Sequence, residues 1–316
     1  MQQFKDILYF ADGEFTPGPA FVRALALARQ NQARLTLMDV TPESDIAADL
    51  IRRYGLTDDV QQSEQRHAAL THLAADWAGE PTLRLRVPIG NPFIEVIRAV
   101  LRDGHDLVIK PARLRTGPAQ GLLGSVDMHL LRKCPCPVWI DRAGASRDAA
   151  AATPRYRSIL AAVDPVQSGT QSLNRQIMDL ATSLATRDGA VVNVVHAWQF
   201  PYSNSARDDA EIEGRGGLGD ALRDLEHRHG EALDSFAADY GLARTAGHVH
   251  LVPGAPAEEI LRLAGELSSD LIVMGTLGRP REPGIFIGTT AEDVLQGLRT
   301  AVMGVKPDGF ISPVGL

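Results

Sequence analysis

The sequence predicts two tandem α/β domains, each a doubly wound parallel sheet of five strands flanked by helices. Two observations predict this fold class: the chain repeats itself, and within each repeat short apolar runs alternate with amphipathic segments. The length of 316 residues is also about two domains' worth, at roughly 100–200 residues per domain.

The internal repeat has no gap over its clearest stretch. Residues 90–110 align with residues 254–274 at a constant offset of 164, and residues 6–12 align with residues 158–164 at an offset of 152. The second half therefore holds about a dozen extra residues, which we place in the polar stretch 205–220. The matched pairs include Gly90/Gly254, Pro92/Pro256, Glu95/Glu259, Arg98/Arg262 and Asp106/Asp270. We interpret the chain as a tandem duplication.

Each half contains five short apolar runs bounded by polar turns. Near-continuous apolar strands of this kind are typical of a parallel sheet that is covered on both faces. We expect strands at 7–11, 34–40, 83–87, 106–110 and 136–140, and again at 159–163, 190–198, 248–252, 270–274 and 301–305.

Amphipathic segments lie between these runs. Residues 21–33, 93–104 and 257–267 have apolar side chains at three- and four-residue spacing, which predicts helices. Pro92 and Pro256 stand where a helix begins, a position that tolerates a missing N–H. In doubly wound folds ligands bind beyond the carboxyl ends of the strands, where loops lead into helices.

One such loop follows the fourth strand of the second half. Two residues separate Gly275 from Gly278, nine residues then precede Gly288 and Thr289, and a helical pattern follows. Glycines let a backbone approach a phosphate, and a helix N-terminus offers N–H groups to an anion. The structural alternative is that Thr289 and Glu292 form a capping box and the glycines merely turn the chain.

These residues resemble the universal stress protein family. Its nucleotide-binding members carry Gly-x2-Gly-x9-Gly-[Ser/Thr] after the fourth strand and an Asp at the end of the first strand. Gly275, Gly278, Gly288 and Thr289 fit that pattern, and Asp164 fits the first-strand position. The two halves resemble the tandem, E-type members over nearly the whole chain, most distinctively at 104–110, 130–139 and 305–308.

The resemblance implies a flavodoxin-like or Rossmann-like fold in each half, with ATP in the second-half loop and Mg²⁺ on its phosphates. It also implies that Asp164 and Ala197 face the adenosine moiety. Arg279 could reach phosphates because guanidinium suits oxyanions, or it could be a solvated loop charge. The expected nucleotide-binding residues are Asp164, Ala197, Gly275, Gly278, Arg279, Gly288, Thr289 and Thr290.

The first half departs from this pattern. Pro111 and Leu114 replace the two leading glycines, so one backbone N–H is missing and a Cβ obstructs close approach. Gly124, Ser125 and Asp12 remain, although the first two can serve helix capping alone. An apolar loop of this half could hold an apolar or amphiphilic molecule or could be core; its residues are Leu122, Leu123 and Val126.

Composition excludes several other classes of protein. A net charge of −7 argues against a nucleic-acid footprint, and no apolar run reaches the roughly 18 residues of a membrane span. The N-terminus does not read as a signal peptide, so we expect a cytoplasmic protein. Cys134 and Cys136 are too few for a disulfide framework and indicate small buried thiols. The pairs His227/His229 and His248/His250 lack matching acids or thiols, so we expect no metal site.

We therefore expect an ATP-binding stress-response module that senses or signals through an unidentified protein partner, with no catalytic residues. Two alternatives stay open: a slow ATPase, and a carrier of an apolar or amphiphilic metabolite in the first half. The expected units are domain 1 (1–142), a linker (143–155), domain 2 (156–307) and a C-terminal tail (308–316).

We also expect the two halves to pack face to face as an intramolecular pseudo-dimer, with further oligomerisation left open. Their final strands are apolar edges that need cover, and the family resemblance implies antiparallel pairing between these strands.

Overall fold

The computed structural model describes residues 4–43, 58–75, 83–113, 123–142, 155–199, 216–277 and 288–316. The first half supplies five strands and the helices that connect them: β1 (Asp6–Phe10), α1 (Pro19–Asn31), β2 (Arg34–Met38), α3 (Asp59–Ala75), β3 (Leu83–Arg86), α4 (Pro92–Asp103), β4 (Leu107–Pro111), α5 (Ser125–Lys133) and β5 (Val138–Asp141). The second half repeats this alternation: β6 (Ser158–Ala162), α6 (Gln171–Asp188), β7 (Val191–Trp198), α8 (Gly216–Ala238), β8 (Val249–Pro253), α9 (Pro256–Glu266), β9 (Leu271–Gly275), α10 (Thr289–Gly297) and β10 (Ala301–Val305), with a short 3-10 turn (Arg244–Ala246) before β8.

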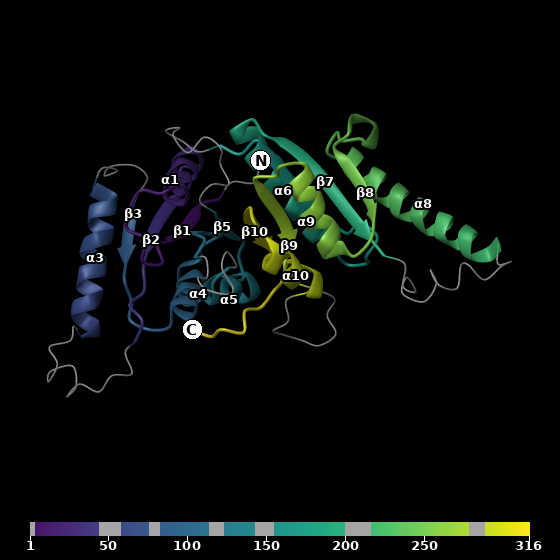
Figure 1. The fold of residues 1–316 in the computed structure, drawn as a ribbon. Helices are drawn as coiled ribbons and strands as arrows, with labels where there is room; N and C mark the ends of the chain where they lie inside the picture. The colour runs from purple at the N-terminus through teal and green to yellow at the C-terminus, as the bar shows by residue number, and fades with distance from the viewer. Residues whose placement is uncertain are drawn as a thin grey trace.

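All ten strands form one sheet, in the order β3-β2-β1-β4-β5-β10-β9-β6-β7-β8 (Figure 1). Within each half the strands are parallel, as the apolar runs predict. The halves join where β5 and β10 pair antiparallel, with Trp139 opposite Met303. The expected antiparallel pairing is confirmed. The halves meet edge to edge, however, so the expectation of face-to-face packing is wrong, because the two apolar edge strands cover each other.

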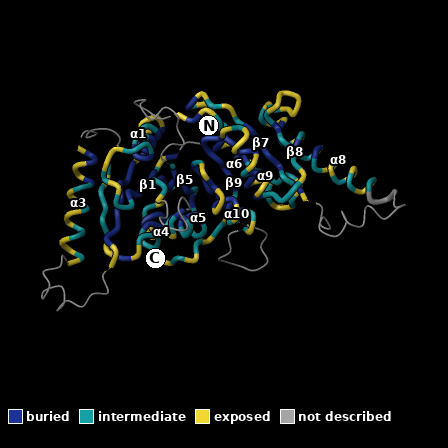
Figure 2. The backbone as a smooth tube through the Cα atoms, in the orientation of Figure 1, coloured by how far each residue is buried: buried dark blue, intermediate teal, exposed yellow. Residues whose placement is uncertain are grey.

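Side chains that alternate along each strand build two cores, one on each face of the sheet. Ile7 and Tyr9 of β1 enter a core that α1, α3, α6 and α8 cover, whereas Leu8 and Phe10 enter the core beneath α4, α5, α9 and α10. The central strands are accordingly dark blue in Figure 2, while much of α3 and α8, at the two ends of the sheet, is exposed. Both cores contain residues of both halves, so the pair of domains is one packed body.

Helix boundaries follow from local sequence. Pro19, Pro92 and Pro256 each occupy the first turn of a helix, where a missing N–H costs nothing. Gly104 and Gly189 end α4 and α6 in the left-handed conformation, with φ of 74° and 72°, which favours glycine.

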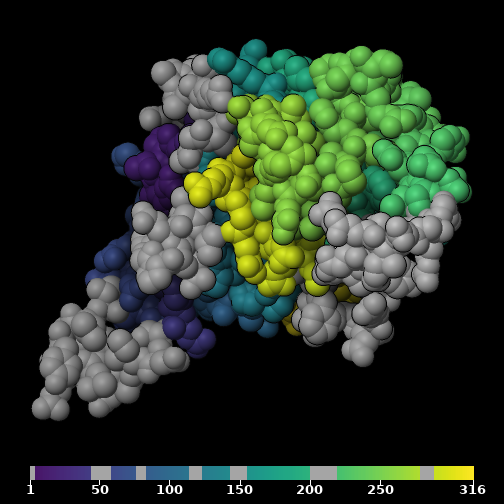
Figure 3. Space-filling view, turned by 45° about the vertical axis from the view of Figure 1, so that its right-hand side comes forward, coloured from purple at the N-terminus to yellow at the C-terminus, as the bar shows by residue number. Residues whose placement is uncertain are grey.

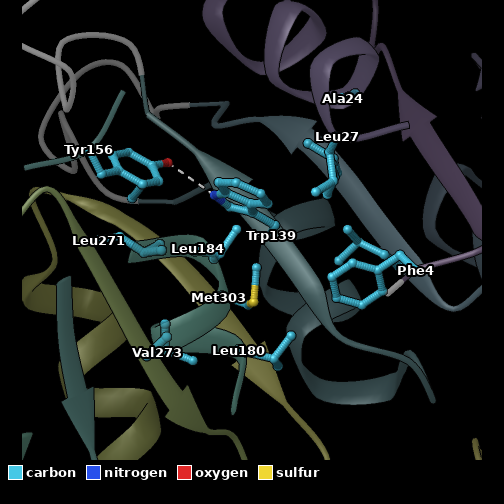
Figure 4. Close-up of a cluster of buried hydrophobic side chains, with 14 of the residues drawn as sticks. Phe4, Ala24, Leu27, Trp139, Tyr156, Leu180, Leu184, Leu271, Val273 and Met303 are labelled. Atoms are coloured by element: carbon cyan, nitrogen blue, oxygen red, sulfur yellow. Dashed lines mark hydrogen bonds between the residues drawn. The ribbon is translucent and has the colours of Figure 1, made fainter. Parts of the chain in front are cut away.

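A buried polar network crosses the seam between the halves. Arg23 of α1 lies 3.2 Å from Asp141 at the end of β5 and 3.7 Å from Asp188 at the end of α6, and its guanidinium stacks 3.8 Å from the ring centre of Tyr156. The Tyr156 hydroxyl donates to Asp141 and accepts a hydrogen bond from Trp139, drawn as a dashed line in Figure 4. Burial raises the pKa of Asp141. Because the network uses both halves, it fixes their relative position.

The C-terminal residues also contact both halves. In Figure 3 the yellow C-terminal part of the chain lies between the purple and blue first half and the green second half. The backbone oxygen of Gly315 accepts a hydrogen bond from Arg98 of α4, and Asp308 accepts one from Gln176 of α6. The tail therefore bridges the halves. The expected domain boundaries themselves stay a prediction, since residues 143–154 lie outside the described residues.

Candidate nucleotide site

The register of the second-half sheet places three of the expected site residues at one edge. Ala162 of β6 is aligned with Val195 of β7 on one side and with Met274 of β9 on the other. Asp164, Ala197 and Gly275 follow these aligned residues by one or two positions, so they lie together at the carboxyl ends of adjacent strands.

The backbone of Asp164 is held while its carboxylate stays accessible. The amide of Asn174 in α6 donates to the Asp164 carbonyl at 2.8 Å and accepts from the Asp164 N–H at 3.1 Å. The Asp164 side chain is 45% exposed, although its Oδ1 accepts the Gln167 N–H. A carboxylate of this kind can accept hydrogen bonds from ligand hydroxyl or amino groups.

The helix that follows the loop begins beside this edge. Gly288 is the N-cap of α10, and its N–H donates to the carbonyl of Thr276, directly after β9, at 3.3 Å. Thr289 and Thr290 are the first two residues of the helix. Among the described residues no side chain caps this N-terminus, and Glu292 instead pairs with Arg132 of α5. The alternative of a Thr289–Glu292 capping box is therefore wrong.

Gly275 has a packing reason to be glycine. A Cβ at this position would lie 2.8 Å from Leu173 Cδ2 of α6. The close approach of α6 to the strand end thus accounts for this glycine without a ligand. Gly278 and Arg279 lie outside the described residues.

A ring cluster that sequence reasoning missed lies next to Asp164 and Ala197. His196 of β7 has its Nδ1 3.1 Å from the Val163 carbonyl and its Nε2 2.7 Å from Nδ1 of His229 in α8. A carbonyl can only accept, so His196 Nδ1 is the protonated donor and His229 donates to its Nε2. Trp198 stacks on His229 with ring centres 5.3 Å apart. Burial lowers the pKa of both histidines, which favours the neutral rings.

A buried lysine stands behind the same strand end. Lys306, directly after β10, is 4% exposed, and its Nζ donates to the Leu131 carbonyl of the first half and to the Thr276 hydroxyl. Burial lowers its pKa to about 8. This residue ties Thr276, directly after β9, to the first half, and its position after an apolar strand did not predict that contact.

At the equivalent edge of the first half, oppositely charged side chains lie against one another. Lys110 at the end of β4 pairs with Asp127 of α5 and lies 3.2 Å from Asp12, which follows β1. Leu123 is 5% exposed and belongs to the core, so this part of the apolar loop fills the interior. Leu114 and Leu122 lie outside the described residues.

The two cysteines and His250 contact other residues of the protein. Cys134 and Cys136 are free, buried thiols with sulfurs 3.6 Å apart, which confirms the expectation of small buried thiols. His250 contacts Asn193 at 3.5 Å. Among the described residues, no group of three or more His, Cys, Asp or Glu side chains is placed to hold a metal ion.

The fold and this edge define a tandem pair of Rossmann-like α/β domains, each with the strand order 3-2-1-4-5, in which the N-terminus of α10 lies at the carboxyl ends of the second-half strands. The model of the universal stress protein family matches residues 3–142 and again residues 155–306. The chain belongs to the universal stress protein family, as a two-domain member. No described helix is both long and apolar enough to cross a membrane.

Several relatives resemble all or most of the chain. The universal stress protein E of Escherichia coli K12 is 31% identical over 241 residues, which cover 76% of this chain and 72% of that protein. The universal stress protein E of Photorhabdus laumondii is 25% identical over 99% of this chain and 98% of its own length. A crystal structure from Pseudomonas aeruginosa UCBPP-PA14 is 25% identical, with a TM-score of 0.72 over 96% of this chain and 94% of that one.

Proposed function

We propose that the chain binds one ATP molecule in its second half and acts as a nucleotide-dependent sensor or signalling module in the stress response. The observation that carries the proposal is the N-terminus of α10, which no described side chain caps. The helix begins at the final Gly-Thr of the Gly-x2-Gly-x9-Gly-Thr sequence. Backbone N–H groups and the positive end of the helix dipole favour a phosphate there.

The rest of the site fits a nucleoside. Asp164 offers an accessible carboxylate, and Ala197 lies one strand away at the same edge. Mg²⁺ usually keeps several waters and binds through substrate phosphates, so Mg²⁺ would enter on the ATP phosphates without a cage of protein ligands.

We propose binding without rapid turnover, because no sequence motif places a general base for attack by water. The output would pass through a protein partner that recognises the loaded second half. A slow ATPase and a metabolite carrier are the alternatives that the experiments below separate.

Calorimetric titration of the full chain with Mg-ATP tests the proposal. We expect one site per chain, loss of most binding in Gly278→Leu, and little change in the first-half variant Pro111→Ala. Two equivalent sites, or loss of binding in Pro111→Ala alone, would show that the nucleotide is assigned to the wrong half.

Two further measurements address the alternatives. Sustained hydrolysis within the usual enzyme range of about 1–10³ turnovers per second would replace the binding proposal by an enzyme. Native mass spectrometry that finds a retained apolar metabolite and no nucleotide would favour the carrier.

A further inference from the structure

The first half contains a buried carboxylate in the first turn of α5. Asp127 is the third residue of α5, and its Oδ2 accepts the N–H of Gly124 at 3.3 Å and the N–H of Arg113 at 3.1 Å. The other carboxylate oxygen pairs with Lys110 Nζ. The side chains of Asp127 and Lys110 are both 0% exposed, so this pair is part of the interior.

Lys110 also forms an ion pair with Asp12, which follows the first strand. Lys110 Nζ lies 3.2 Å from Asp12 Oδ2, and Arg113 Nε lies 3.7 Å from the same oxygen. Asp12 is consequently 11% exposed at its side chain. A ligand phosphate at this edge would meet two carboxylates whose cations are already engaged, which disfavours its binding.

The second half has neither member of this pair. At the constant offset of 164, Ala291 stands where Asp127 stands and Met274 stands where Lys110 stands. No side chain in the described part of the chain caps the N-terminus of α10, and Asp164, the equivalent of Asp12, has a side chain that is 45% exposed. The backbone groups that hold the Asp127 carboxylate correspond to Leu277 and Gly288.

The neighbouring strand end shows the same contrast. In the first half Asp39, directly after β2, is 1% exposed, pairs with Arg66 of α3, and accepts the N–H of Gly13 at 3.0 Å. The strand register of the second half places His196 at the equivalent position, directly after Val195, where it forms a hydrogen bond with His229 of α8. The first half thus fills its strand ends with ion pairs, whereas the second half has neutral rings there.

We propose that Asp127, held by Lys110, is an intramolecular substitute for the ligand anion in the first half, and that Ala291 is the residue that keeps the second half open to phosphate. This inference rests on the proposed binding of ATP. Its positive evidence is that backbone groups of the first half do hold a carboxylate at the position where the second half is expected to hold a phosphate.

The test introduces the first-half carboxylate into the second half of the full chain. Ala291→Asp should weaken Mg-ATP binding by at least about 100-fold, because the new carboxylate takes two phosphate donors and repels the phosphates. Ala291→Ser, which adds a single hydroxyl oxygen and no charge, should bind within about threefold of the unmodified chain. Calorimetry gives the affinities, and thermal melting reports whether each variant folds.

A second variant guards against a folding defect caused by an unpaired buried carboxylate. Met274→Lys combined with Ala291→Asp recreates the pair of the first half, so it should fold as stably as the unmodified chain and still fail to bind Mg-ATP. If the unmodified chain binds Mg-ATP and the double variant binds it equally well, the inference is wrong and the proposed function stands. Equal loss in Ala291→Ser would also overturn it, because the loss would then need no carboxylate. If the unmodified chain does not bind Mg-ATP, the proposed function itself fails.

Discussion

Replacement of Arg23 by methionine should destabilise both halves together. The substitution keeps much of the side-chain volume but leaves Asp141 and Asp188 in the interior without their shared cation. Both carboxylates are at most 3% exposed at their side chains, and Asp188 retains Arg187 as a partner. Removal of one partner from a buried pair typically costs about 3–5 kcal/mol of unfolding free energy.

Urea denaturation followed by tryptophan fluorescence and by circular dichroism measures this loss. With a slope of about 3 kcal/mol per molar urea, the midpoint should fall by about 1–1.7 M, and the two signals should move together because the network joins the halves. The matched control is Arg34→Met, which removes a pair between Arg34, 50% exposed, and Asp6, and should shift the midpoint little. A loss below about 1 kcal/mol in Arg23→Met would refute the reasoning, since the carboxylates would then not depend on Arg23.

Two further predictions concern the seam and the ring cluster. Gly304→Ala should lower the free energy of unfolding by about 1–3 kcal/mol, because its Cβ would lie 2.6 Å from Leu131 Cδ2 and 2.7 Å from Thr276 Cγ2; unchanged denaturation would contradict the tight packing. Burial lowers the pKa of His196 and His229, so below about pH 6.5 the unfolded chain takes up protons that the folded chain resists. The contribution of these two histidines to the free energy of unfolding should be constant above that pH and fall as the pH drops from that value through the folded pKa values. The fall should be less steep in His196→Gln, and identical pH profiles over this range would exclude the cluster as the cause.

The strands of this protein could be predicted from sequence because most of them are apolar runs with polar ends and because the pattern recurs in the second half. The expected strand at 301–305 coincides with β10, and the expected helix at 93–104 differs from α4 by a single residue at each end. Helix α3 carries a much weaker signal. Of its described residues only Leu70, Leu73 and Ala74 are buried, because the helix covers the outer end of the sheet and leaves most of its surface in water.

The candidate site was predictable where it depends on strand ends and not where it depends on side chains that meet across a loop. Asp164, Ala197 and Gly275 reach one edge because parallel strands end together. Lys110 and Asp127 are polar residues seventeen positions apart, and their contact depends on how the intervening loop returns the chain to the strand end. A comparison of the repeats at those two positions was the signal that could have revealed it.

The covalent link between the halves has a consequence for how they can evolve. The pairing of two identical subunits through their last strands depends on protein concentration. Any mutation in their gene appears in the sites of both subunits. Here β5 and β10 belong to one chain, so their pairing is intramolecular and independent of concentration. Selection can then act on codons 127 and 291 separately. Under the proposal for Asp127 and Ala291, a duplicated and fused gene keeps one half that binds no phosphate and one half that binds it in a fixed ratio of one to one, whereas a homodimer encoded by one gene copy has two identical halves.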